Sequence, residues 1–184
     1  IRQKQVLIDD GSYESYDKLL IATGSSPFAP PVPGLDNVKN KFTFTTLDDA
    51  KALESVLNDK TLEGVLNDKA AESVPNVNSG SNKSSKKVLI VGAGLIGLKC
   101  AEGISRKNVQ IVCVDLAPRV LSSILDDESS EIIKKHLEDN HIKFYLKQQI
   151  KEFKEDFALL GDDTKIPFDV LVMAAGVRAN ISLL

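Results

Sequence analysis

Residues 87–97 have the sequence KVLIVGAGLIG, and the fold class follows from this stretch. Val88 to Val91 are aliphatic and mostly β-branched, which is typical of a short buried strand. The three glycines that follow have the spacing G-x-G-x-x-G, and the segment from Leu95 to Lys107 is predicted to be a helix. The stretch therefore predicts a strand, a tight turn and a helix in direct succession.

The same alternation continues toward the end of the chain. Asp126 is predicted to cap a helix that carries Ile132, Ile133 and Leu137 on one face. Two short strands are predicted on either side of Gly161-Asp162-Asp163. Buried strands are predicted at residues 109–114, 142–146 and 169–174. Strands that alternate with helices indicate a parallel sheet with right-handed crossovers, so the predicted class is α/β, a Rossmann-like doubly wound parallel sheet with a β-meander.

The glycine turn has the sequence context of a dinucleotide-binding site. It lies between a buried strand and a helix, and Asp115 ends the next strand, as the dinucleotide fingerprint requires. Gly92 would allow the tight turn, Gly94 would let a pyrophosphate approach the backbone, and Gly97 would let the helix pack on the strand. The helix N-terminus offers free N–H groups and the positive end of a dipole to the phosphates.

Asp115 also bears on the choice of dinucleotide. A carboxylate at this position can accept hydrogen bonds from both hydroxyls of the adenosine ribose, and it would repel a 2′-phosphate. NAD(H) is therefore the expected cofactor, with NADH preferred over NADPH. Arg119 could cover the adenine or reach a phosphate, which would weaken this preference, or it could be a solvated loop residue.

The composition argues against several other functions. The 184 residues carry 23 Lys and Arg against 26 Asp and Glu, and a net charge of -3 gives no electrostatic surface for nucleic acid or an anionic membrane. No apolar run approaches the ~20 residues of a membrane span. Two cysteines, Cys100 and Cys113, cannot form a disulfide framework or a zinc site alone, so a reducing cytoplasm is the expected location. Both are expected to be small buried hydrophobes. His136 and His141 are expected to be exposed, without a metal.

The first part of the chain has a different character. Residues 5–8 followed by Asp10-Gly11 predict a β-hairpin, and residues 18–22 predict a buried strand. Four prolines between Ser25 and Gly34 predict an extended linker. Thr46 and Asp49 form a variant of the capping box, which predicts the start of a helix. Residues 1–34 are therefore predicted to be the remnant of a first domain with a linker, and residues 35–184 a second domain.

Residues 54–80 contain a nine-residue tandem repeat, with the copies ESVLNDKTL, EGVLNDKAA and the degraded ESVPNVNSG. Nine residues rotate an α-helix by about two and a half turns, so successive Val-Leu pairs would face opposite sides. One straight helix could not dock all copies on one surface. We therefore interpret residues 54–86, approximately, as an insertion, either an expanded surface loop or a partner-binding segment.

Four segments resemble the FAD-dependent pyridine nucleotide-disulfide oxidoreductase superfamily, in particular its branch of NADH oxidases, rubredoxin reductases and nitrite reductase large subunits. YDKLLIATGSSPFAPPVPG at residues 16–34 is similar to the segment that leaves the FAD domain in that family, which implies that residues 1–34 are the C-terminal remnant of the FAD domain and its linker. KVLIVGAGLIGLKCAEGI at residues 87–104 is similar to its NAD fingerprint. The strand and helix at residues 114–145 and the segment DVLVMAAGVRAN at residues 169–180 complete the resemblance.

The resemblance implies the NADH-binding domain of a flavoprotein oxidoreductase, in which hydride passes from NADH to FAD and on to an unidentified acceptor: nitrite, rubredoxin, oxygen or a thiol/disulfide. The family's FAD motifs would lie upstream of Ile1 and beyond Leu184, so the chain is expected to be a piece of a longer enzyme. We expect it to be inactive alone and not to retain FAD, with the missing FAD-domain segments as partners. The resemblance leaves open whether the longer parent enzyme forms a homodimer. The alternative function is a non-catalytic module that binds NAD(H) or senses redox state.

The resemblance also implies further site residues. Ala175 and Gly176 follow the last strand, which lies near the flavin or nicotinamide in the family. Lys99 stands where the family usually has Glu, close to the nicotinamide, and would disfavour NAD⁺ relative to NADH unless it swings into solvent; Ala179 replaces the usual Pro. No catalytic residue and no metal ligand is predicted. The candidate cofactor-binding residues are Gly92, Ala93, Gly94, Leu95, Ile96, Gly97, Lys99, Asp115, Leu116, Arg119, Ala175 and Gly176.

Overall fold

The computed structural model describes residues 4–58 and 85–182, which fall into two compact units. The terminal unit comprises Ile1–Ser26 and Val177–Leu184, and the central unit comprises Pro27–Gly176. The proline-rich segment, predicted above as the end of residues 1–34, belongs from Pro27 onward to the central unit. Two hydrogen bonds hold it there: the Phe153 amide donates to the Pro33 carbonyl at 2.8 Å, and the Phe28 amide donates to the Gly176 carbonyl at 2.9 Å.

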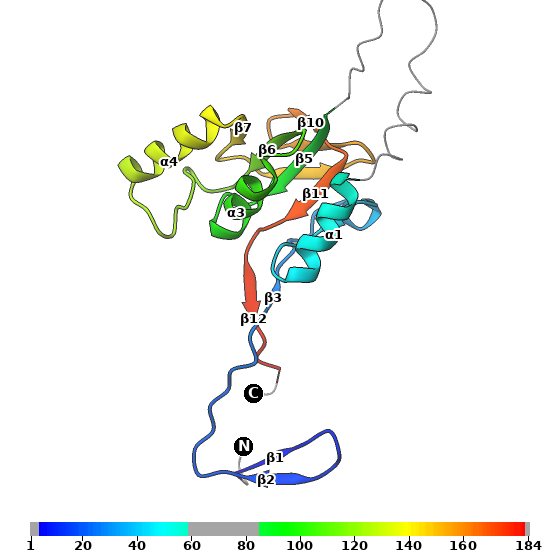
Figure 1. The fold of residues 1–184 in the computed structure, drawn as a ribbon, viewed down its shortest axis with the longest axis vertical. Coiled ribbons are helices and arrows are strands. Elements are labelled where there is room, and N and C mark those ends of the chain that lie inside the picture. The colour runs from blue at the N-terminus through cyan, green and yellow to red at the C-terminus, as the bar shows by residue number, and fades with distance from the viewer. Residues whose placement is uncertain (1–3, 59–84, 183–184) are drawn as a thin grey trace, which may run out of the picture. The chain divides into compact units, whose positions relative to one another are not determined.

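The central unit is built on a five-stranded parallel sheet, which confirms the predicted α/β class (Figure 1). The strand order is β4-β11-β5-β6-β7, so β5, which leads into the glycine turn, lies in the middle. The strands are β4 (Lys41–Phe42), β5 (Lys86–Val91), β6 (Val109–Val114), β7 (Ile142–Tyr145) and β11 (Val170–Met173). The crossovers on either side of β6 run through α3 (Leu95–Ile104) and α4 (Asp127–Asp139).

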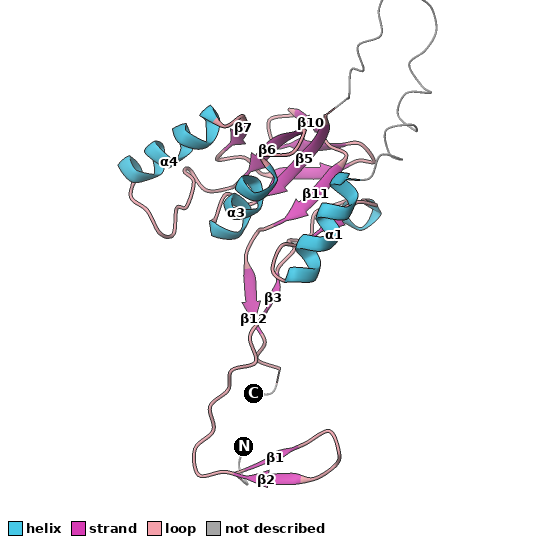
Figure 2. Cartoon of the chain, in the orientation of Figure 1, coloured by secondary structure: helices cyan, strands magenta, loops and turns pink. Residues whose placement is uncertain are grey.

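Helices cover one face of the sheet, and an antiparallel meander covers the other (Figure 2). The helical layer contains α1 (Leu47–Asn58), α3 and α4, and a 3-10 turn, η1 (Leu35–Asn37), precedes β4. The meander has the strand order β10-β9-β8 and consists of β8 (Ile150–Phe153), β9 (Phe157–Leu160) and β10 (Lys165–Pro167). Val88 and Ile90 are buried on the helical side, whereas Leu89 is buried on the meander side. Both faces are covered, which is why the last four residues of β5, Val88 to Val91, are all apolar.

Two predicted helix starts are confirmed. Asp126 is the N-cap of α4, and its carboxylate accepts a hydrogen bond from the Ser129 amide at 2.8 Å. This bond holds the pKa of the Asp126 carboxyl below its usual range. At α1, the Asp49 amide donates to the Thr46 hydroxyl and the Thr46 amide donates to the Asp49 carboxylate, each at 3.1 Å. This reciprocal pairing is a capping box in which Asp takes the place of Glu.

The terminal unit contains two pairs of strands. The predicted hairpin is present as β1 (Gln5–Leu7) and β2 (Tyr13–Ser15), which pair antiparallel around Asp10-Gly11. β3 (Ser25–Pro27) pairs with β12 (Val177–Ala179). Asn180 ties these two segments together, because its side-chain nitrogen donates to the Thr23 carbonyl at 3.0 Å and its side-chain oxygen accepts from the Ser26 hydroxyl at 2.8 Å.

The strand predicted at residues 18–22 is wrong. All five residues are described and none is in a strand; Leu20 is 88% exposed, and Leu19 and Ile21 are exposed as well. A strand needs a neighbour that completes its backbone hydrogen bonds, and none of the described strands of either unit pairs with this segment. The apolar pattern indicates a surface suited to burial, but it does not supply the neighbouring strand.

The nine-residue repeats lie outside the described residues, because α1 ends at Asn58 and β5 begins at Lys86 with residues 59–84 between them. The flanks of that interval are tied to the central unit. The Lys86 ammonium donates to the Val56 carbonyl at 2.6 Å, and the Lys107 ammonium pairs with the Glu54 carboxylate at 2.9 Å. The end of α1 is therefore fixed to β5, which leads into the glycine turn, and to the segment between α3 and β6.

Candidate functional site

The carboxyl ends of four parallel strands form one edge of the sheet. Met173 of β11 is in register with Val91 of β5, Val91 with Val114 of β6, and Val114 with Tyr145 of β7. Four segments therefore start side by side along this edge: residues 174–176, 92–97, 115–116 and 146–150. Ligands of open α/β sheets bind in the crevice outside the carboxyl ends of the strands, so this edge is the candidate site.

Two glycines of the turn are required by close backbone contacts. Gly92 has a φ of +115°, and a Cβ on it would lie 2.2 Å from the Ala174 carbonyl oxygen. A Cβ on Gly97 would lie 2.0 Å from the Gly92 carbonyl oxygen. A side chain at either position would push the backbone apart. These glycines therefore let the start of α3 pack against the ends of β5 and β11.

Gly94 differs from Gly92 and Gly97, because the fold would tolerate a side chain at this position. Its φ of -83° and ψ of -172° are extended, and a Cβ there would meet no atom within 4 Å. The first N–H groups of a helix have no acceptor within the helix. Gly94, the N-cap of α3, has no side chain that could accept from them. Open space in front of such N–H groups, at the positive end of a helix dipole, suits a phosphate.

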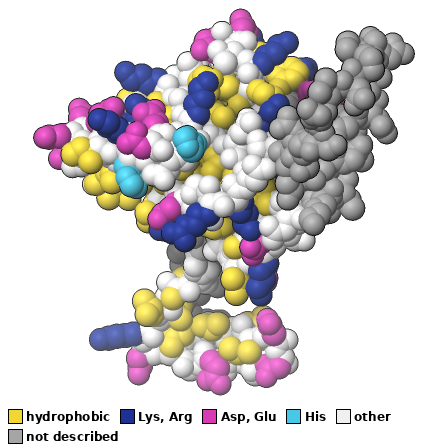
Figure 3. All heavy atoms as spheres, turned by 45° about the horizontal axis from the view of Figure 1, so that its top comes forward, with side chains coloured by type: hydrophobic (Ala, Val, Ile, Leu, Met, Phe, Trp, Pro, Cys, Tyr) yellow, Lys and Arg dark blue, Asp and Glu magenta, His cyan; other side chains and the backbone are white. Residues whose placement is uncertain are grey.

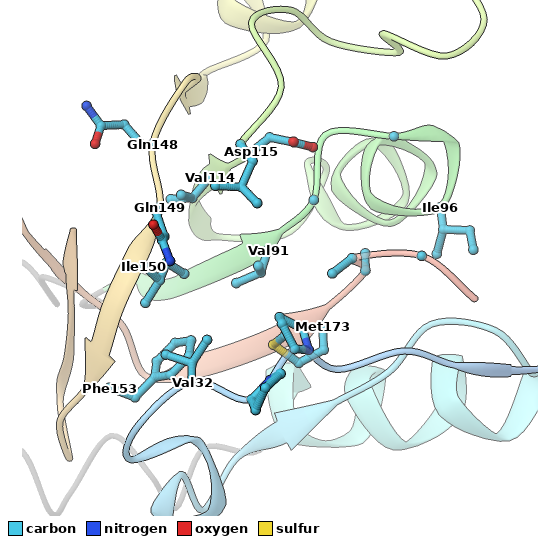
Figure 4. A pocket seen from close by; sticks show the side chains of 18 of the residues that line it. Val32, Val91, Ile96, Val114, Asp115, Gln148, Gln149, Ile150, Phe153 and Met173 are labelled. Carbon is cyan, nitrogen blue, oxygen red and sulfur yellow. The ribbon is translucent and has the colours of Figure 1, made fainter. Parts of the chain in front are cut away.

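Asp115 extends from the end of β6 toward the turn before α3 (Figure 4). Its Oδ2 accepts a hydrogen bond from the Ala93 amide at 2.5 Å, and its Oδ1 accepts one from the Ala117 amide at 2.7 Å. These bonds fix the orientation of the carboxylate. A carboxylate has about four acceptor positions, so each oxygen can accept a further donor from a ligand.

A cavity of about 730 Å³ runs along this edge and lies wholly within the central unit (Figure 4). Val32, Phe153 and Met173 contribute apolar side chains to its wall. Its polar groups include the Asp115 carboxylate and the side chain of Gln149. Cavities of roughly 300–1,000 Å³ with apolar walls and a few polar groups are typical of cofactor sites.

Some of the residues predicted from the sequence line this cavity, and others do not. Ala93 and Gly97 do not line it, but they shape the turn: the Ala93 amide holds Asp115, and Gly97 contacts the Gly92 backbone. The predicted residues that do line the cavity are Gly92, Gly94, Leu95, Ile96, Asp115, Leu116, Ala175 and Gly176.

Lys99 and Arg119 lie apart from it. The Lys99 ammonium is 2.6 Å from the Glu102 carboxylate, and both residues line a second cavity, of about 520 Å³, between α3 and α4. The Arg119 guanidinium is 3.0 Å from the Asp127 carboxylate and donates to the carbonyls of Ser122 and Leu125, each at 3.3 Å. Arg119 therefore orders the loop between β6 and α4.

The structure also adds residues that the sequence reasoning missed. Pro30, Pro31 and Val32 line the cavity from the proline-rich segment, and residues 148–150 line it from the loop after β7. The second group could have been inferred, because residues after a third parallel strand share an edge with Asp115. The proline-rich segment carried no such signal, since its position depends on its hydrogen bond to Phe153 in the meander.

Both cysteines are buried, which confirms their prediction as apolar core residues. Cys100 and Cys113 are each 0% exposed, and both thiols are free. Burial raises the pKa of the Cys100 thiol to about 12, and burial also raises the pKa of the Cys113 thiol. The thiolate is the reactive form, so burial suppresses thiol chemistry at both positions.

We therefore expect neither thiol of the native chain to react with a soluble aromatic disulfide reagent at mildly alkaline pH. The release of the coloured thiol product measures the reaction, and the denatured chain, in which both thiols should react, is the control. Rapid reaction of either cysteine in the native protein would contradict its burial.

The surface of the central unit mixes charges of both signs on the face shown in Figure 3. His136 and His141 are exposed, as predicted. Within residues 4–58 and 85–182, no group of three or more His, Cys, Asp or Glu is arranged to hold a metal ion. The helices described in these ranges include none with the length and apolar character that crossing a membrane would need.

The parallel sheet, the glycine turn and the helix after it define a Rossmann-like α/β protein. The profile of the family described as pyridine nucleotide-disulphide oxidoreductase matches residues 1–184, and the chain belongs to this family. Its relatives include an NADH oxidase of Methanocaldococcus jannaschii, 32% identical over 179 residues, and the NAD(P)H nitrite reductase of Bacillus subtilis, 30% identical over 184 residues. These matches cover 95% and 98% of this chain but 35% and 20% of the relatives, so the chain spans about a third of the first and a fifth of the second.

Solved structures share the fold. The water-forming NADH oxidase of Lactobacillus brevis, bound to NADH, superposes with a TM-score of 0.74 at 23% identity, over 100% of this chain and 37% of its own. Reduced CoADR-RHD of Bacillus anthracis superposes with a TM-score of 0.77 at 20% identity, over 99% of this chain and 30% of its own. At these identities the likeness establishes the fold alone.

Proposed function

We propose that the central unit binds NADH in the cavity at the carboxyl edge of its sheet. The observation that carries this proposal is the open space at Gly94, the N-cap of α3, where a pyrophosphate would fit at the helix N-terminus. The cavity continues from there to Asp115 on one side and to Ala175 and Gly176 on the other. The residues present therefore fit a dinucleotide. Its proposed contacts are Gly92, Gly94, Leu95, Ile96, Asp115, Leu116, Ala175 and Gly176.

Asp115 would hold the adenosine ribose. Both carboxylate oxygens are oriented by backbone amides, and each can accept one ribose hydroxyl. A 2′-phosphate would bring negative charge close to the same carboxylate, so NADH should bind more tightly than NADPH. The names of several relatives support this choice, since they are NADH oxidases.

Within the whole protein, we propose that this unit presents NADH to FAD in an oxidoreductase. When bound, NADH supplies a hydride and FAD accepts it; the residues of this chain bind and orient the dinucleotide. Segments outside this chain would hold most of the FAD. The terminal acceptor is one of nitrite, rubredoxin, oxygen or a thiol/disulfide, and the isolated chain is expected to bind NADH without turnover.

Substitutions in an engineered relative suggest which residues at the end of β6 to change when the choice between NADH and NADPH is tested. Five substitutions convert the Lactobacillus brevis NADH oxidase into a water-forming NADPH oxidase, and they include an aspartate changed to alanine with the next residue changed to arginine. A glycine is also replaced there, and it precedes the aspartate by as many residues as Gly97 precedes Asp115 here. The corresponding exchange in this chain is Asp115→Ala with Leu116→Arg.

We expect the unaltered chain to bind NADPH at least about tenfold more weakly than NADH, which corresponds to about 1.4 kcal/mol. Asp115→Ala should narrow this ratio because the repulsion is lost. Adding Leu116→Arg should narrow it further, because a guanidinium offers the 2′-phosphate a charge-assisted hydrogen bond. Titration followed by the fluorescence of the reduced nicotinamide measures both dissociation constants.

Asp139→Ala is the matched control for the loss of a carboxylate. Asp139 is exposed at the end of α4 and lines only the second cavity. Asp139→Ala should therefore leave the ratio of the NADPH and NADH dissociation constants unchanged. Equal or tighter binding of NADPH by the unaltered chain would contradict the role given to Asp115.

A further inference from the structure

The loop after β7 is fixed beside Asp115 by backbone hydrogen bonds. The backbone N–H of Gln148 donates to the Asp115 carbonyl, and the backbone N–H of Lys147 donates to the Ala117 carbonyl, each at 3.0 Å. The Gly161 amide donates to the Gln149 carbonyl at 2.8 Å and ties the same loop to the meander. Gln149 is therefore held at a set position on the cavity wall, next to the strand end that carries Asp115.

The two glutamines of this loop are used differently. Gln148 donates a side-chain hydrogen bond to the Asp162 carboxylate at 3.0 Å, and its side chain is directed away from the cavity in Figure 4. The Gln149 side chain lies beside Ile150 on the cavity wall (Figure 4). In the part of the chain that the structure describes, no hydrogen bond of the Gln149 side chain is present. Its amide is available to a ligand.

The strand order decides which part of a dinucleotide reaches Gln149. This step rests on the proposed function, with the pyrophosphate at the end of β5 and the adenosine ribose at Asp115 after β6. The next strand in the same direction is β7, and residues 148–150 follow it. The base attached to that ribose therefore extends toward Gln149, whereas the nicotinamide half extends toward Ala175 and Gly176 after β11.

We propose that Gln149 determines specificity for adenine in the bound dinucleotide. The side-chain amide of Gln can accept a hydrogen bond from the 6-amino group of adenine and donate one to N7. Leu116 is 71% exposed and Ile150 is buried; both line the cavity and offer apolar surface to the faces of the ring. Hypoxanthine has an oxygen acceptor in place of the 6-amino donor, so the same amide cannot form the same pair with it.

The test compares NADH with the reduced form of nicotinamide hypoxanthine dinucleotide, titrated into the 184-residue chain and followed by nicotinamide fluorescence. The unaltered chain should bind the hypoxanthine form at least about tenfold more weakly than NADH, a preference worth about 1.4 kcal/mol. Gln149→Leu keeps the side-chain size but removes the amide, and it should reduce this ratio to less than about twofold. Gln148→Leu is the matched control, and it should keep the full ratio because its amide is bonded to Asp162.

The outcomes separate this inference from the proposed function. If NADH binds but Gln149→Leu leaves the base preference intact, or if Gln148→Leu abolishes it equally, the assignment of Gln149 is overturned while the NADH site stands. The absence of base discrimination in the unaltered chain would also overturn it. If the unaltered chain binds neither dinucleotide, the proposed function itself fails. Thermal melting of both variants checks that they are folded. Because Gln149 is exposed, Gln149→Leu should change the melting temperature little.

Discussion

Gly94→Ala should weaken NADH binding by at least about tenfold, or about 1.4 kcal/mol, and leave the melting temperature of the chain unchanged. The fold should tolerate alanine because the Gly94 backbone is extended and the added Cβ would meet no atom within 4 Å. The same methyl group would fill part of the open space beside Gly94, at the start of α3, in which the pyrophosphate is proposed to lie. The pyrophosphate could then no longer approach the helix N-terminus as closely. Fluorescence titration measures the binding, and thermal melting monitored by circular dichroism measures the stability.

Gly103→Ala is the control for this prediction. Gly103 lies in the same helix, and its added Cβ would also meet no atom within 4 Å, but it does not line the cavity. NADH binding should be unchanged, and stability should rise slightly because Gly in a helix interior costs roughly 0.5–1 kcal/mol relative to Ala. NADH binding by Gly94→Ala with unaltered affinity would show that the phosphates do not lie at the start of α3.

Gly92→Ala should have the opposite effect, a large loss of stability. Its φ of +115° is strained for any side chain, and its Cβ would lie 2.2 Å from the Ala174 carbonyl oxygen, which belongs to backbone and cannot rotate away. We expect a loss of about 3 kcal/mol from the backbone strain and the clash together. For a chain of this size this corresponds to a fall in melting temperature of roughly 6–12 °C.

The two substitutions add the same methyl group two positions apart. If Gly92→Ala melted at the same temperature as Gly94→Ala, the contact between the ends of β5 and β11 would not be as tight as the structure has it. If both variants lost stability equally, Gly94 would have a structural role and its use as a phosphate cradle would lose its support. The pair therefore separates the glycine that the fold needs from the one that the ligand needs.

The sequence was most informative where a local pattern has one physical solution. The strand, turn and helix around Gly92 follow from steric requirements within a short stretch, and the structure has the same elements in the same order. The helix starts at Thr46 and Asp126 are likewise local, because each cap bonds to an amide within three residues. The alternation of strands and helices was sufficient for the α/β class, since parallel strands require crossovers.

The sequence was least informative where position depends on distant partners. The apolar run at residues 18–22 forms no strand, because a strand requires a neighbour that the pattern does not specify. The position of Lys99 near the nicotinamide was predicted from the family resemblance and stays a prediction; in the structure its ammonium pairs with Glu102 beside the second cavity. Gln149 was missed because its place beside Asp115 results from the register of β6 with β7 and from backbone hydrogen bonds across two loops.

The central claim is that NADH binds along the edge formed by the ends of β11, β5, β6 and β7. Mapping backbone-amide chemical shifts by NMR during an NADH titration tests this claim most directly. The largest changes should occur at residues 92–97, Asp115 and residues 148–150, with smaller changes at Ala175 and Gly176. Changes confined to the second cavity, at residues such as Glu102, Arg106 and His136, or the absence of any saturable change, would contradict it.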